Sequence, residues 1–269
     1  MKGKSLRGIW MMFVVFVVIF ILNMSVVSDI NSTQRMWLVM DVWSLVLSIV
    51  LLLRHMLPPV KQIAISLTLG GLVSLSYLQG NTFSIISSFL ITVMASLAVF
   101  STFTVYRESP VRFLRSNGKG GVTGSIIWGL LFGLALGAVN VGLMLSNNEL
   151  DFQVSLSRFL VSLSPAVLEE IAMRTLFFAF CYSLLQGRIA TKGQRFTCWF
   201  MMVIPHVLIH TPEAFMSNGV ISGLIVVILY TVIFGLPFAY LQWKRDVASA
   251  MIAHGVVDFI RFCLFGLPF

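Results

Sequence analysis

Charged side chains are scarce in this sequence. Only 10% of its 269 residues are Asp, Glu, Lys or Arg, whereas 58% are hydrophobic and the mean hydropathy is +0.96. Soluble domains carry roughly 25% charged residues, so the composition excludes a soluble globular protein. It predicts an all-α, polytopic membrane protein, in which each span needs about 20 apolar residues.

Cysteine is also rare, and familiar nucleophile motifs are missing. The three cysteines, Cys181, Cys198 and Cys263, lie apart in apolar segments without metal or redox spacing, so we interpret them as packing residues. The H-E-x-x-H sequence of zinc proteases is absent, and no serine or cysteine stands in a nucleophile motif beside the polar groups described below. A hydrolase with this sequence would therefore use water as its nucleophile.

Acidic residues are fewer than basic ones, ten against eighteen, which gives a net charge of +8. In a soluble protein this charge would suggest binding to nucleic acid. Here, if the N-terminus is cytoplasmic and every apolar run crosses the bilayer, fourteen of the eighteen basic residues fall on the cytoplasmic side. They are Lys2, Lys4, Arg7, Arg54, Lys61, Arg107, Arg112, Arg115, Lys119, Arg188, Lys192, Arg195, Lys244 and Arg245. The bias predicts a multi-pass cell-membrane protein with a cytoplasmic N-terminus, in contact with lipid and not with nucleic acid.

Nine apolar runs predict the membrane spans. They cover residues 9–27, 36–53, 60–78, 83–106, 122–145, 155–186, 196–210, 220–242 and 247–265. The run 196–210 is short for a full crossing, so the prediction is a bundle of eight or nine spans. We divide the chain into a four-span region, 1–121, which ends in a basic cytoplasmic loop, and a core, 122–269. Within the core, Gly129, Gly133 and Gly137 predict close packing against another helix of the bundle.

The run 155–186 contains three ionisable residues, Glu169, Glu170 and Arg174. An ionised side chain near the middle of a bilayer costs at least a few kcal/mol, so such residues mark functional sites. Glu170 and Arg174 are four residues apart, in the order that favours an ion pair on a helix. Glu169 lies about 100° round the helix and is left without an evident partner.

Later apolar runs contribute His206, His210, His254 and Asp258. Each has a structural alternative: the histidines can bond to backbone carbonyls, and Asp258 can pair with Arg261. Counted along the spans at about 1.5 Å per residue, however, all of these residues overlap in depth with the two glutamates. We therefore predict one polar cluster near the middle of the membrane.

The chemistry available to this cluster is proton transfer. A carboxylate in an apolar pocket can act as a general base on water, and a histidine can share or relay the proton. Histidine and carboxylates are also ligands for zinc, so a divalent metal such as zinc remains an alternative. The candidate ligands are Glu169, His206, His254 and Asp258. Apart from that alternative, the sequence indicates no cofactor.

These residues resemble the motifs of the CAAX-protease and bacteriocin-processing family of intramembrane proteases, also called the Abi or CPBP family. Its Glu-Glu-x-x-x-Arg motif is matched by Glu169, Glu170 and Arg174, and its His-x-x-x-Asn/Asp motif by His254 and Asp258. Its Phe-x-x-x-His motif is matched imperfectly, because His206 is preceded by Met202 and His210 by His206. The resemblance extends over residues 122–265, and the first four spans carry none of the motifs.

The resemblance implies a set of roles. Glu169 would activate water with His206, Glu170 and Arg174 would orient the site, and His254 with Asp258 would bind the oxyanion or position the water. His210 is the secondary candidate, since His206 lies at a separation from Glu169 closer to the family's. An Asp258 carboxylate cannot donate a hydrogen bond, so it must hold a proton, accept one from His254, or bind a metal.

The function implied is an integral-membrane endopeptidase that acts on a peptide or membrane-associated protein. We favour processing of a peptide or leader, or bacteriocin self-immunity, and CAAX prenyl-protein cleavage is an alternative. A second alternative is a catalytically silent scaffold or regulator of a membrane-protein partner. A proton-coupled transporter is less favoured, because the two halves show no convincing repeat.

Overall fold

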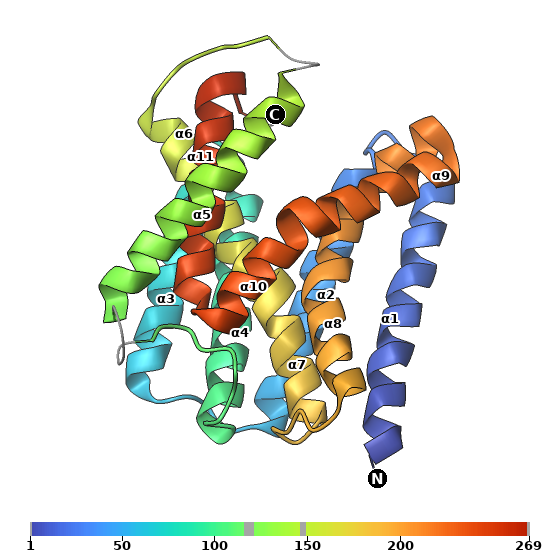
Figure 1. Ribbon diagram of the computed structural model, residues 1–269, viewed down its shortest axis with the longest axis vertical. Helices are drawn as coiled ribbons and strands as arrows, with labels where there is room; N and C mark the ends of the chain where they lie inside the picture. The colour runs from blue at the N-terminus through green and yellow to red at the C-terminus, as the bar shows by residue number, and fades with distance from the viewer. Residues whose placement is uncertain (1, 116–120, 146–148, 268–269) are drawn as a thin grey trace.

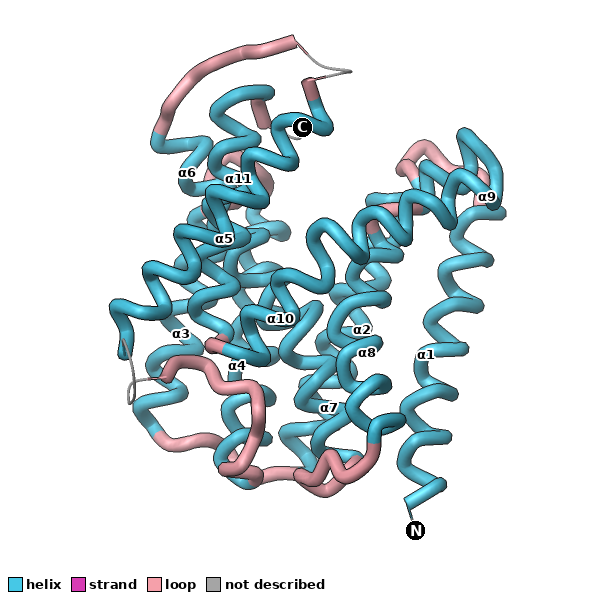
Figure 2. Tube along the Cα trace, viewed as in Figure 1, coloured by secondary structure: helices cyan, strands magenta, loops and turns pink. Residues whose placement is uncertain are grey.

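The computed structural model describes residues 2–115, 121–145 and 149–267. These residues form helices and loops and contain no strand (Figures 1 and 2). The α-helices are α1 (Lys2–Ser25), α2 (Ser32–Arg54), α3 (Val60–Leu75), α4 (Thr82–Val105), α5 (Gly121–Met144), α6 (Leu156–Leu163), α7 (Leu176–Leu184), α8 (Lys192–Ile209), α9 (Pro212–Tyr230), α10 (Leu236–Lys244) and α11 (Val247–Phe265). Two π-helical segments, η1 (Ser164–Thr175) and η2 (Thr231–Gly235), join α6 to α7 and α9 to α10. The predicted all-α class is confirmed.

Each of the nine predicted apolar runs coincides with one helical segment. Six segments of the described chain are long and apolar enough to cross a membrane, and α3 is a shorter apolar helix. The six are Leu6–Ser25, Ser32–Arg54, Thr82–Val105, Gly121–Met144, Pro212–Lys244 and Val247–Phe265. The remaining two runs form the α6–η1–α7 unit and α8. The protein is therefore a multi-pass membrane protein.

The basic loops gather at one end of the bundle. The loops after α2, α4 and α7 lie at the end where α1 begins, whereas α11 finishes at the opposite end (Figure 1). Asp246 holds this basic end together, because its carboxylate accepts hydrogen bonds from the Ser125 hydroxyl at 2.6 Å and the backbone N–H groups of Arg115 and Ser249 at 3.1 and 2.9 Å. The arrangement agrees with the charge bias, and the cytoplasmic side of this end remains a prediction.

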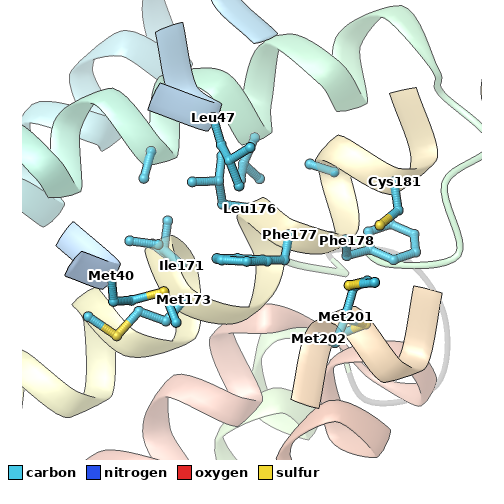
Figure 3. Packing of buried hydrophobic residues seen from close by; sticks show 14 of the residues in the cluster. Met40, Leu47, Ile171, Met173, Leu176, Phe177, Phe178, Cys181, Met201 and Met202 are labelled. Carbon is cyan, nitrogen blue, oxygen red and sulfur yellow. The ribbon is translucent and has the colours of Figure 1, made fainter. Parts of the chain in front are cut away.

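The most deeply buried helical segment is η1–α7, at the centre of the bundle. Ile171 and Met173 of η1, and Leu176, Phe177 and Phe178 of α7, pack against side chains of α2 and α8 (Figure 3). The Ser44 hydroxyl of α2 also donates to the Ala172 carbonyl at 2.9 Å. All three cysteines are buried and unpaired, as packing residues should be. The site-bearing helix is thus held on several sides by the core.

The small-residue stripe of α5 packs against α11, as predicted. A Cβ added at Gly129, Gly133 or Gly137 would come within 2.7, 2.7 or 2.8 Å of Ile252, Val256 or Ile260. Real Cβ atoms do not approach other heavy atoms so closely, so the two backbones can lie together only because these positions are glycine. The stripe fixes α11, which carries two predicted site residues.

We expect Gly133→Val to destabilise the purified protein by about 1–3 kcal/mol, because the new side chain overlaps Val256. The matched control is Gly142→Val on the same helix, where the described structure has no neighbouring heavy atom within 4 Å of the added Cβ. Thermal unfolding in detergent compares the two variants. Equal unfolding midpoints would show that the stripe does not determine the packing.

The orientation predicts a difference in labelling. With a cytoplasmic N-terminus, Asp29→Cys, beyond α1, lies outside the cell, and Lys192→Cys, at the start of α8, lies inside. Both positions are exposed. A membrane-impermeant maleimide applied to intact cells should label only the first variant, and permeabilised cells should show both. The reverse pattern would invert the orientation.

Candidate active site

Three segments bring all the predicted site residues into one cluster. Glu169, Glu170 and Arg174 lie in η1, His206 and His210 lie in the last turn and at the end of α8, and His254 and Asp258 lie one turn apart in α11. Pro165 stands at the beginning of η1 and Pro205 inside α8. A π-helical stretch inside a helix is frequent at functional sites. The structure thus brings these residues together in one polar cluster, while the roles of its members remain predictions.

Glu170 is completely buried and surrounded by partners. Its Oε1 atom lies 2.9 Å from Arg174 Nε and 2.7 Å from His254 Nδ1, and its Oε2 accepts a hydrogen bond from Gln242 Nε2 at 2.7 Å. Arg174 also donates to the Gly235 carbonyl at 3.2 Å and lies over the Phe238 ring. A buried charge is tolerated when it is paired and hydrogen-bonded in this way. Both oxygens of Glu170 are thus occupied.

Glu169 faces the histidines. Its Oε2 atom lies 2.7 Å from His206 Nε2, 3.7 Å from His254 Nε2 and 3.8 Å from His210 Nε2. The His206 contact is within hydrogen-bonding distance and the other two are not. The geometry therefore pairs Glu169 with His206, the histidine preferred from the sequence. Glu169 is also the carboxylate not engaged by the arginine.

His254 lies between carboxylates. Its Nδ1 faces Glu170 at 2.7 Å, its Nε2 faces Asp258 Oδ2 at 3.3 Å, and the Phe238 ring stacks on it at 4.5 Å between centroids. An imidazolium, with a proton on each nitrogen, can donate to both carboxylates. Of the alternatives open to Asp258, this contact favours the one in which its carboxylate accepts from His254. Asp258 also lies 3.5 Å from Arg261 Nη1, so the structural pairing expected as an alternative is present as a longer contact.

One side of the cluster reaches the surface. The side chains of Glu169, His254 and Asp258 are at most 10% exposed, whereas that of His210 is 35% exposed. Away from His210, η2 and α10 contact Arg174 and Glu170 through the Gly235 carbonyl and Gln242. His210 lies at the end of α8 remote from the basic loops, with its ring against Trp37. The group most accessible from outside is therefore a histidine next to Glu169.

Potential metal ligands converge at one place in the described chain. The ligand atoms of Glu169, His206 and His210 all lie within 4.8 Å of one another. The ligand set predicted from the sequence shares Glu169 and His206 with this group. Its other two members were His254 and Asp258, and it did not include His210. His254 Nε2 also lies 3.7 Å from Glu169 Oε2, so the metal set predicted from the sequence stays a prediction.

Two residues of α10 complete the site and were not identified from the sequence. Gln242 bridges Glu170 and the Thr175 hydroxyl, and Phe238 stacks on His254. A signal for Gln242 was present, because an amide in an apolar run requires a hydrogen-bond partner. Phe238 gave no signal, since phenylalanine is common in this sequence, with 23 copies.

Arg174→Met should destabilise the protein by about 3–5 kcal/mol, because it leaves the Glu170 carboxylate buried without its cation. Arg261→Met is the control, since it removes a partly exposed arginine 3.5 Å from Asp258 and should cost less than about 1 kcal/mol. Thermal or denaturant unfolding measures both effects. Similar stability of the two variants would contradict the importance assigned to the buried pair.

Comparison with known proteins gives one match. Residues 151–260 match the family model described as type II CAAX prenyl endopeptidase Rce1-like. The match begins before α6 and ends in α11, so it contains every residue of the cluster. Searches among curated proteins and among solved structures found no match. The segment that carries the site is therefore similar to the Rce1-like CAAX protease family, in agreement with the motifs.

Proposed function

We propose that this protein is an intramembrane endopeptidase in which Glu169 and His206 activate a water molecule. The observation that carries the proposal is the 2.7 Å contact between Glu169 Oε2 and His206 Nε2, next to a second glutamate whose oxygens are occupied. A general base needs an available lone pair and a partner that can share the proton. Glu169 meets this requirement, and Glu170 is better suited to hold the site in place.

In the proposed reaction, Glu169 removes a proton from water as the water oxygen attacks the scissile carbonyl carbon. The C–N bond then breaks, and the proton passes from Glu169, directly or through His206, to the leaving amine. One water is consumed, and one carboxyl and one amino terminus are formed. Glu169 ends each cycle ionised.

His254 is proposed to stabilise the oxyanion of the tetrahedral intermediate. Its Nε2 atom lies 3.7 Å from Glu169 Oε2 and 3.3 Å from Asp258 Oδ2, so its proton would be shared between Asp258 and the oxyanion. Its other nitrogen is held by Glu170 at 2.7 Å. A donor that is already oriented loses little energy to reorganisation when charge develops on the substrate. Glu170, Arg174 and Gln242 act through His254 as positioning residues, and Asp258 orients the same ring.

The substrate is proposed to be a peptide or the end of a membrane-associated protein. We favour peptide or leader processing, or bacteriocin self-immunity, for this compact membrane protein. The description of the matching family supports a second candidate, cleavage of a prenylated CAAX terminus. Both candidates require the same hydrolytic site, so they differ in the substrate and not in the residues.

Purified protein in liposomes should cleave members of a peptide panel that includes prenylated CAAX peptides and unmodified leader peptides. Mass spectrometry identifies the products. Glu169→Gln should reduce cleavage by at least about 100-fold, since general acid–base catalysis contributes roughly 10²–10⁴. Glu108→Gln, a change of the same chemistry at an exposed position in the basic end, should retain wild-type activity.

The same variant tests the scaffold alternative. If Glu169→Gln retains its full cellular effect, the protein acts through a partner and the catalytic proposal is wrong. Equal cleavage by wild type and Glu169→Gln would likewise remove Glu169 from the reaction.

A further inference from the structure

His210 lies next to the proposed base without an assigned part in the reaction. Its Nε2 atom lies 3.3 Å from His206 Nε2 and 3.8 Å from Glu169 Oε2, and the third edge of this triangle is the 2.7 Å contact between Glu169 and His206. Each of the three atoms can offer a lone pair once the proton of the hydrogen bond between Glu169 and His206 is released. All three atoms lie within 4.8 Å of one another, close enough to coordinate one cation.

The size of the triangle fits zinc. A tetrahedral zinc ion with bonds of about 2.0–2.1 Å keeps its ligand atoms roughly 3.3 Å apart. The three edges, 2.7, 3.3 and 3.8 Å, are centred on that separation, so shifts of about half an ångström would equalise them. Two imidazoles and a carboxylate form a ligand set used for zinc, whereas magnesium and calcium prefer oxygen ligands.

The surroundings provide both access and orientation. His206 and Glu169 are buried, while the 35% exposure of the His210 side chain opens this corner to the outside. The Trp37 ring packs edge-on against the His210 ring, with 5.0 Å between centroids, which restricts its rotation. A cation can thus arrive through the exposed histidine and bind two buried ligands that are already in place.

We propose that Glu169, His206 and His210 bind one zinc-class divalent cation, which inhibits the peptidase by occupying the base. The inhibitory part rests on the proposed function. The cation would take the Glu169 oxygen that faces both His206 and His254. Glu170 cannot replace it, because its oxygens are bound by Arg174, Gln242 and His254. His210 would therefore make catalysis sensitive to metal.

Binding is tested without any substrate. Protein stripped with a chelator is titrated with Zn²⁺ and with Co²⁺, whose visible absorption reports tetrahedral coordination, and with Mg²⁺ as a control. Wild type should bind one Zn²⁺ or Co²⁺ per chain and no Mg²⁺. His210→Ala and the less truncated His210→Asn should weaken binding by more than about 100-fold, because even loss of an outer partner typically costs 10–100-fold.

The matched control is His55→Ala. His55 contacts the Ser183 hydroxyl at 2.8 Å near the basic end, so its removal should leave metal affinity unchanged. Absence of stoichiometric binding in wild type, or equal affinity in the His210 and His55 variants, would overturn the site. Either result leaves the proposed peptidase activity to be judged by its own assay.

Inhibition is tested next with a peptide that wild type cleaves. Zinc should lower turnover and a chelator should restore it. The zinc concentration for half-inhibition should rise at least tenfold in His210→Ala, measured against the zinc-free activity of that variant. Loss of cleavage on chelation would instead identify the cation as a cofactor, and unchanged cleavage at saturating zinc would show a site without control over the reaction. Either outcome would overturn the inhibitory role.

Discussion

The site depends on the burial of the Glu170 charge. Its carboxylate is fully enclosed, and three partners from three helical segments compensate it: Arg174 of η1, Gln242 of α10 and His254 of α11. Each partner is needed because an uncompensated charge in this environment costs several kcal/mol. The same contacts join the three segments in space. Electrostatic compensation and the assembly of the site are therefore one requirement.

The adjacent glutamates illustrate how neighbouring residues of one type can take different tasks. Glu170 points into the interior, where its oxygens are occupied, and Glu169 points to the histidines on the accessible side. Two adjacent carboxylates on one helix would repel each other if they shared a pocket. The separation of their partners removes that conflict and leaves one carboxylate available for chemistry.

Much of the fold followed from composition and apolar periodicity. All nine runs became helical segments, because a predominantly apolar run in lipid can satisfy its own backbone hydrogen bonds as a helix. The cluster was also predictable, because ionisable residues at the same depth in a bundle are stabilised when they pair with one another. The π-helical stretch η1 and the contacts of Gln242 and Phe238 were not predictable in detail. They depend on how α10 packs against η1 and α11, and a pattern along one segment does not contain that information.

The α5–α11 contact has a mechanical consequence for the site. Gly133 meets Val256, two residues from His254, and each residue of an α-helix advances it by about 1.5 Å and turns it by about 100°. Sliding α11 by one residue would bring the side chains of its neighbours against the glycine backbone and would rotate His254 away from both glutamates. The glycine stripe therefore fixes the register of α11 against α5. In that register the imidazole of His254 faces the glutamates.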